Sequence, residues 1–154
     1  MIGRVKKWLG IEGVKVELLT PDTLQRDGNM LYGKLRFGSM HAQTVTSFKV
    51  VMIEKYSRGR EEDRLSDEYE LGELTVEETV DIPAGGTVEV PFRLPYRVTD
   101  SEMDELQNRN FLTGWAVKAL KAYEKVSSEY RIEAEAKVAG VALSPFDRKE
   151  IELV

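Results

Sequence analysis

Apolar residues recur at every second position over several stretches of the chain, and this period of two is its dominant pattern. The alternation runs through residues 14–18, 31–37, 88–94 and 132–138. Successive side chains of a β-strand point to opposite faces, so each stretch indicates a strand with one face on a core and one face in water. The pattern predicts antiparallel strands at these four places.

Residues 45–56 form a longer stretch with apolar side chains on both faces, so we expect a central strand that is partly covered on both sides. Asp27-Gly28-Asn29, a sequence that tolerates positive φ, and the glycine- and proline-rich segment 83–86 are typical of tight turns. Pro91 has no amide to donate, which places its strand at an edge or a bulge. The sequence therefore predicts an all-β fold, a two-sheet antiparallel β-sandwich.

Residues 101–126 depart from this pattern. Ser101 opens a capping-box-like sequence with an acidic first turn, and Leu112, Trp115 and Tyr123 follow at helical spacing. We expect one helical insertion, near residues 101–125, that packs over an end or edge of the sandwich. In the alternative interpretation this helix docks a partner, with Trp115 exposed.

The first 13 residues form a short basic segment ahead of the first strand. Met1–Leu9 can make two helical turns with Trp8 on an apolar side and Arg4, Lys6 and Lys7 beside it, a composition that suits a lipid interface. Nine residues bury little, so membrane contact through these four side chains would be weak. The alternative is that Trp8 docks on the sandwich. We expect residues 1–154 to form a single domain.

Charge is distributed unevenly along the chain. Residues 61–81 hold ten acidic side chains against Arg64, a local charge of −9, whereas the whole chain carries −5. Nucleic-acid binding needs a continuous cationic surface, so this distribution argues against it. The chain has no window of about 20 apolar residues and no apolar run of the signal-peptide kind, so we expect a cytoplasmic protein.

Residue types limit the chemistry that the chain can perform. It has no cysteine and only one histidine, His41, in a polar stretch between two strands. Neither a Gly-x-Ser-x-Gly elbow nor a phosphate-binding Gly-x-x-x-x-Gly-Lys loop occurs. We therefore predict no catalytic residue, no bound metal and no cofactor, and a protein that binds rather than turns over a substrate.

Two charged groups remain as candidates for recognition. Lys55, Arg58 and Arg60 lie at an expected hairpin tip, where guanidinium groups suit an acidic or phosphorylated partner, although the acidic run that follows can neutralise them. Farther on, residues 68, 70 and 73 are glutamates at strand-like intervals. Because the glycine-punctuated calcium loop is missing, we interpret them as a solvated, repulsive face that discourages edge aggregation.

The order of segments resembles the arrestin-like sandwich. The most specific part is a glycine-containing turn that leads into the apolar-Pro-Phe-x-Leu-Pro strand of residues 82–96, and residues 142–153 look like the close of a first arrestin half. Within this fold the chain resembles the bacterial sporulation-control protein family. Family members have two arrestin-like halves whereas this chain has one, and the segment 101–126 is longer than the sandwich needs.

The resemblance implies a non-enzymatic regulatory or scaffolding module with a protein partner, and it carries over no catalytic residue. Such a module would bind through an exposed sheet edge or through loops, and Lys55, Arg58, Arg60 and Trp115 are the candidate partner-binding residues. Two other functions stay open. One is a weakly membrane-associated protein, and the other is a small-ligand or carbohydrate-binding sandwich. The latter would need exposed rings, for which Tyr56, Tyr69 and Tyr96 are the candidates.

Overall fold

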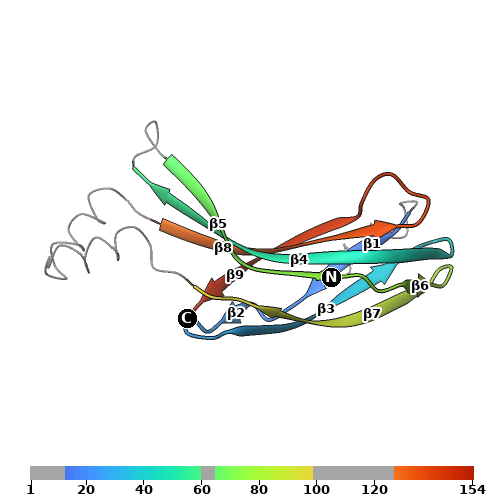
Figure 1. The fold of residues 1–154 in the computed structure, drawn as a ribbon, viewed down its shortest axis with the longest axis horizontal. Coiled ribbons are helices and arrows are strands. Elements are labelled where there is room, and N and C mark those ends of the chain that lie inside the picture. The colour runs from blue at the N-terminus through green and yellow to red at the C-terminus, as the bar shows by residue number, and fades with distance from the viewer. Residues whose placement is uncertain (1–12, 60–64, 99–126) are drawn as a thin grey trace, which may run out of the picture.

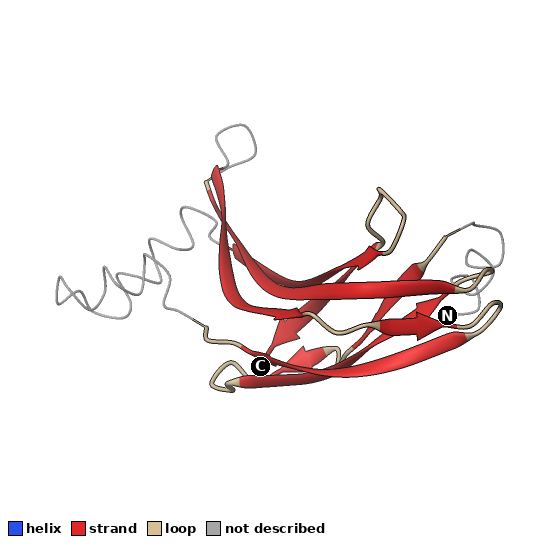
Figure 2. Cartoon of the chain, turned by 45° about the vertical axis from the view of Figure 1, so that its right-hand side comes forward, coloured by secondary structure: helices blue, strands red, loops and turns tan. Residues whose placement is uncertain are grey.

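The structure, a computed structural model, describes residues 13–59, 65–98 and 127–154, and in these ranges the chain folds into strands joined by turns, without a helix (Figure 2). In chain order the strands are β1 (Lys15–Leu19), β2 (Thr23–Leu24), β3 (Met30–Gly38), β4 (Gln43–Arg58), β5 (Leu65–Val76), β6 (Val80–Ile82), β7 (Thr87–Pro95), β8 (Ser127–Val138) and β9 (Phe146–Leu153). The all-β prediction is confirmed. The predicted helical insertion at 101–126 is not confirmed, because these residues lie outside the described ranges.

The strands form two sheets that face each other (Figure 1). The smaller sheet has the order β1-β3-β7. The larger has the order β2-β9-β8-β4-β5, with β6 paired to β4 beyond the end of β5. All pairs are antiparallel except β2 with β9, where Thr23 and Leu24 run parallel to the end of the chain. The predicted two-sheet sandwich is therefore correct, and this short parallel pair is its one departure from the antiparallel expectation.

Strand β4 is the centre of the larger sheet, as its two-sided apolar pattern predicts. It pairs with β8 along one edge and with β5 and β6 along the other. A register shift in β5, opposite Met52 and Ile53, leaves Leu71 as an extra residue. The bulge keeps Glu70 and Glu73 on the same outer face, although they are three positions apart.

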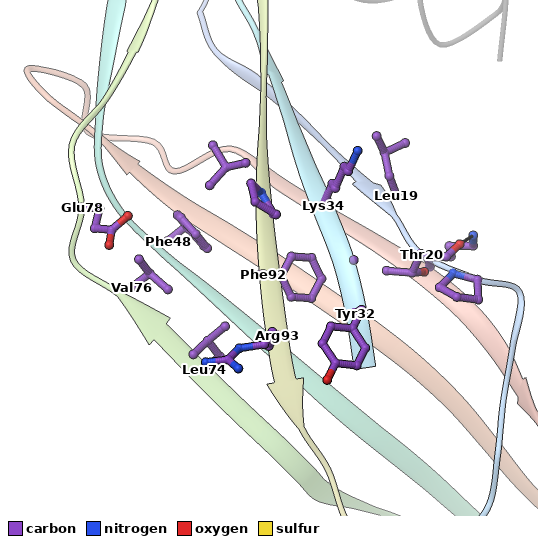
Figure 3. A pocket seen from close by; sticks show the side chains of 15 residues that line it. Leu19, Thr20, Tyr32, Lys34, Phe48, Leu74, Val76, Glu78, Phe92 and Arg93 are labelled. Atoms are coloured by element: carbon purple, nitrogen blue, oxygen red, sulfur yellow. Dashed lines mark hydrogen bonds between the residues drawn. The ribbon is translucent and has the colours of Figure 1, made fainter. Parts of the chain in front are cut away.

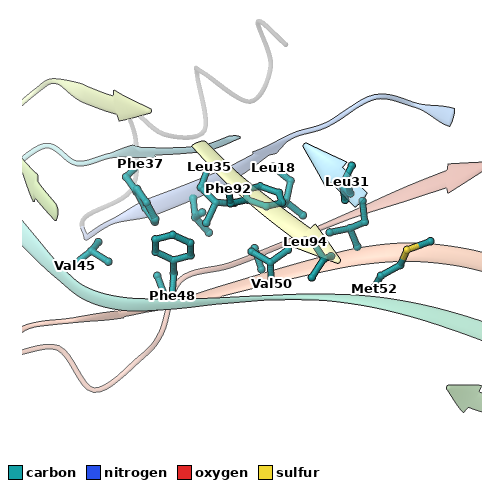
Figure 4. Close-up of a cluster of buried hydrophobic side chains, with 14 of the residues drawn as sticks. Leu18, Leu31, Leu35, Phe37, Val45, Phe48, Val50, Met52, Phe92 and Leu94 are labelled. Atoms are coloured by element: carbon teal, nitrogen blue, oxygen red, sulfur yellow. The ribbon is translucent and has the colours of Figure 1, made fainter. Parts of the chain in front are cut away.

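The core lies between the two sheets. Phe37 of β3 and Phe48 of β4 meet with their ring centroids 6.2 Å apart, and Leu35, Val50 and Leu94 are fully buried around them (Figure 4). These are the inward positions of the alternating stretches. Burying each such side chain stabilises the fold by about 1.5–3 kcal/mol, which is why the period of two determines the face of each strand.

The two predicted turns form, but for different physical reasons. In the β6–β7 turn Gly85 has a φ of +71°, and the Gly86 amide donates to the Pro83 carbonyl over 3.0 Å. Gly28 is not in the left-handed region. A side chain there would place its Cβ 2.3 Å from the Tyr96 hydroxyl oxygen, so close packing requires this glycine, and the conformational reason predicted for it is wrong.

Candidate protein-interaction groove

The open side of the sandwich lies between β5 and β7. Among the described strands each of these two pairs on one side only, β5 with β4 and β7 with β3, so two sheet edges face each other. At one end they meet, because the Arg97 amide donates to the Leu71 carbonyl over 2.9 Å. At the other end the β6–β7 turn joins the sheets. The edge position of β7 is the one that Pro91 predicts.

A groove of about 1070 Å³ opens between these two closures and wraps around β7. Its walls are mainly apolar. Figure 3 shows Phe48, Leu74 and Val76 on one side of β7, and Tyr32, Lys34 and Leu19 on the other. Tyr32 is 65% exposed, so part of this apolar surface meets water directly. We call this surface the β5–β7 groove.

Gly33 shapes the floor of the β5–β7 groove. A Cβ at this position would lie 2.7 Å from the Phe92 ring and 2.9 Å from the Thr20 methyl carbon. The missing side chain therefore lets the Phe92 ring lie across the smaller sheet, where a larger residue in β3 would displace it. A glycine inside a strand often marks such a close approach.

The rim of the groove is cationic, in contrast to the net charge of −5 on the chain. Lys34, Arg93 and Lys149 line it against the single carboxylate of Glu78. Lys149 is held by Asp22, 2.9 Å away, and donates to the Thr20 carbonyl. Within the described ranges Arg93 forms no ion pair, and Lys34 has one long contact, 3.8 Å to Glu89, which leaves Arg93 available and Lys34 weakly paired.

The sequence-predicted recognition residues do not gather at this groove. Strand β4 continues through Arg58 rather than ending in a tip at 55, so the period of two sends Lys55 and Arg58 to opposite faces. Arg60 and Trp115 lie outside the described residues, and so do Arg4, Lys6, Lys7 and Trp8. Their predicted roles in partner or membrane binding stay predictions.

Lys55 belongs to the outer face of the larger sheet, together with the three glutamates. These glutamates do share that face, but a repulsive face is the wrong description for two of them. Arg131 lies 2.8 Å from Glu68 and 2.6 Å from Glu133, and Lys49 lies 3.3 Å from Glu73. The hydrogen bond from Arg131 lowers the pKa of Glu68. Cross-strand ion pairs thus neutralise much of this face.

A second, more polar hollow of about 700 Å³ lies near the chain end, between β2, β8 and β9. Beside it Glu54 is buried, with 5% of its surface exposed, and accepts hydrogen bonds from Ser128 at 2.7 Å and from Tyr130 at 3.3 Å. Arg26 donates to the Tyr130 hydroxyl oxygen over 3.4 Å. These hydroxyl donors offset the cost of burying a carboxylate and anchor the end of the sandwich.

The aromatic residues proposed for carbohydrate binding do not form a platform. Tyr56 and Tyr96 are buried in the interior, and of the three only Tyr69 is exposed. Burial raises the pKa of Tyr96 above its ordinary value of 10.0, with a smaller contribution from Asp27. In the part of the chain that the structure describes, no three histidine or acidic side chains gather to hold a metal ion. His41 is exposed in the β3–β4 loop.

Sequence reasoning missed the residues of the groove, although two signals for it were present. Gly33 interrupts an apolar alternation, and Pro91 marks an edge. What the sequence did not reveal is that β5 lies opposite that edge. Among the described residues no helix is long and apolar enough to cross a membrane.

Two antiparallel sheets in this order, with an open lateral edge, define an arrestin-like β-sandwich. Residues 2–103 match the model of the Spo0M family, described as SpoOM protein, and the chain belongs to this family. Among solved structures it is similar to Spo0M, the sporulation control protein of Bacillus subtilis, with a TM-score of 0.62 and 14% identity over 93% of this chain. The chain spans 50% of the length of that protein. No curated protein matches it by sequence.

Proposed function

We propose that this protein is a non-enzymatic interaction module in sporulation control, and that it binds a protein partner in the β5–β7 groove. The observation that carries the proposal is the groove itself, an open apolar surface between two sheet edges with Tyr32 exposed beside it. Its lining supplies contact area and a few charges rather than a nucleophile with a paired base. The Spo0M family match supports the regulatory part of the proposal.

Photo-crosslinking at two exposed tyrosines tests where the partner binds. Tyr32 lines the groove, whereas Tyr69 is 40% exposed on β5 and does not line it. Benzoylphenylalanine replaces either tyrosine with a similar ring, and irradiation in the source cells traps whatever lies beside it. We expect one dominant adduct from position 32 and none from position 69. Capture from position 69 alone would place the partner elsewhere and reject this groove.

The biological role and the location are tested separately. A role in sporulation control predicts that deleting the gene changes the yield of heat-resistant spores, and that restoring the wild-type chain corrects it. Val90→Lys blocks the groove with a charged side chain. Provided that circular dichroism shows this variant to be folded, we expect that it does not restore the spore yield. The proposed cytoplasmic location is tested by cell fractionation.

A further inference from the structure

We propose that the β5–β7 groove binds an extended acidic segment of the partner, which adds as a short strand along the open edge of β7. This inference deepens the proposed function and rests on it, because it states what kind of segment the groove receives. The first argument is the backbone. An edge strand presents amides and carbonyls without a partner, and a strand laid beside it satisfies them.

The second argument is the shape of the opening. The two edges are fixed to each other at Leu71 and Arg97 and at the β6–β7 turn, so the space between them has a defined length. Its walls include residues 74–78 on one edge and 90–93 on the other, four or five residues each. At about 3.3 Å per residue an occupant of similar length spans roughly 15 Å. Apolar side chains at alternate positions of such a segment would face Phe48, Val76 and Phe92.

The third argument is charge. Lys34 pairs with Pro91 and Arg93 pairs with Tyr32 in the register of β3 with β7, so the two cations are diagonal neighbours on the outer face of the smaller sheet. Arg93 forms no ion pair with the residues described, and Lys34 has only the 3.8 Å contact with Glu89. A cationic rim on a chain of net charge −5 selects an acidic segment, since like charge repels basic ones.

Pro91 limits the pairing rather than preventing it. It removes one donor from β7, so only a few hydrogen bonds can form along this edge. Such an interruption also discourages copies of the chain from pairing edge to edge without end. A short acidic segment whose affinity comes from apolar pockets as well as backbone bonds fits this edge.

The probe is a library of random heptapeptides displayed on phage, selected against the whole chain and measured afterwards as synthetic peptides by fluorescence anisotropy. We expect selected sequences to carry apolar residues at alternate positions with aspartate or glutamate between them. Enrichment of basic peptides, or of apolar residues at helical spacing, would overturn the proposal.

N-methylation of the selected peptide tests strand addition without changing the protein. In an added strand, amides of one parity point to β7 and those of the other point away. Methylating an amide of the first parity should weaken binding at least tenfold, whereas the other parity should change it less than twofold. If both parities are tolerated equally, the segment does not add as a strand.

Matched double variants test the charge. Lys34→Gln with Arg93→Gln should weaken binding of the acidic peptide about three- to tenfold at low salt, because each exposed ion pair contributes little. Lys55→Gln with Arg148→Gln removes the same charge from the outer face of the larger sheet and should leave binding unchanged. The reverse result would move the site to that outer face and overturn the proposal.

Two further outcomes separate this inference from the proposed function. If position 32 captures a partner through a basic or helical segment, the proposal of strand addition by an acidic segment is wrong, while the proposal that the groove binds a partner is kept. If neither tyrosine position captures a partner, the proposed function fails as well. Sedimentation of the free chain tests a second copy as occupant, and a dimer that Lys34→Gln with Arg93→Gln dissociates would overturn the acidic-partner proposal.

Discussion

Gly72 lies at the closed end of the β5–β7 groove, where the two strand edges meet. Although Gly72 is only half-buried, we expect its replacement by alanine to lower the stability of the fold markedly. A Cβ at this position would lie 2.1 Å from the Pro95 carbonyl oxygen and 3.1 Å from the Tyr96 Cα. Both neighbours are backbone atoms, so no side chain can rotate away. Relieving the contact to at least 3.0 Å moves the two edges apart by about 0.9 Å.

The cost can be worked from this displacement. The Arg97 amide to Leu71 carbonyl bond, 2.9 Å long, would stretch to nearly 3.8 Å and be lost. Overpacking typically costs about 1–3 kcal/mol, and a lost hydrogen bond about 1 kcal/mol. We expect Gly72→Ala to lower the free energy of unfolding by about 2–4 kcal/mol, or Tm by roughly 5–15 °C.

Urea unfolding followed by circular dichroism measures the loss, and hydrogen exchange of the Arg97 amide reports where it arises. Gly85→Ala is the matched control. Gly85 has a φ of +71° with no atom within 4 Å of a Cβ, so alanine there costs only the left-handed strain, about 1–2 kcal/mol. If Gly72→Ala is as stable as wild type and the Arg97 amide stays protected, the steric reasoning is refuted.

Four other changes follow from the packing and the charges. Phe37→Ala should cost about 3–5 kcal/mol in urea unfolding, because the ring is fully buried. The lowered pKa of Glu68 means that its ionised form stabilises the fold above a pH of about 4.5, and that this contribution is lost as the pH falls through the folded pKa. In thermal melts the Tm of Arg131→Gln should therefore fall less between neutral and acid pH than the Tm of the wild type. The raised pKa of Tyr96 means that its contribution is present below pH 10 and lost as the pH rises further, and Tyr96→Phe should remove this alkaline loss. Deleting residues 1–9 should lower flotation with anionic vesicles without changing Tm; an earlier melt with no lipid binding at either length would show that Trp8 packs on the domain.

Five of the described strands were predictable because burial acts on every second residue, namely β1, β3, β4, β7 and β8. In β3, for example, Leu31, Leu35 and Phe37 are inward and fully buried, and the free energy of burying each is large enough to override local preferences. The long pattern at 45–56 was read correctly as central for the same reason. Pro91 predicted an edge or a bulge because its missing amide is a local covalent property, and β7 is an edge strand.

The groove was not predictable because it depends on which strands meet. No residue near Gly72 in the sequence predicts its contact with the Pro95 carbonyl, because Pro95 lies in a strand more than 20 residues farther along the chain. The same holds for Gly28. The turn at this residue was predicted correctly, but the need for glycine there comes from close packing against Tyr96 and not from a positive φ. The register shift at Leu71 likewise changes the facing of Glu73, and its one local signal is Gly72, which follows directly and is of the residue type that often marks a bulge.

These observations connect the least predictable residues with the proposed binding surface. Gly72 and Gly33 both lie where another part of the chain approaches too closely for a side chain. Gly33 lines the β5–β7 groove, and Gly72 lies at its closed end, where β5 and β7 meet. Gly72 lets the two sheet edges meet at one point, which is why they diverge along a defined length. Gly33 lets Phe92 form the floor of the opening. The two glycines therefore tie the stability of the fold to the shape of its open edge.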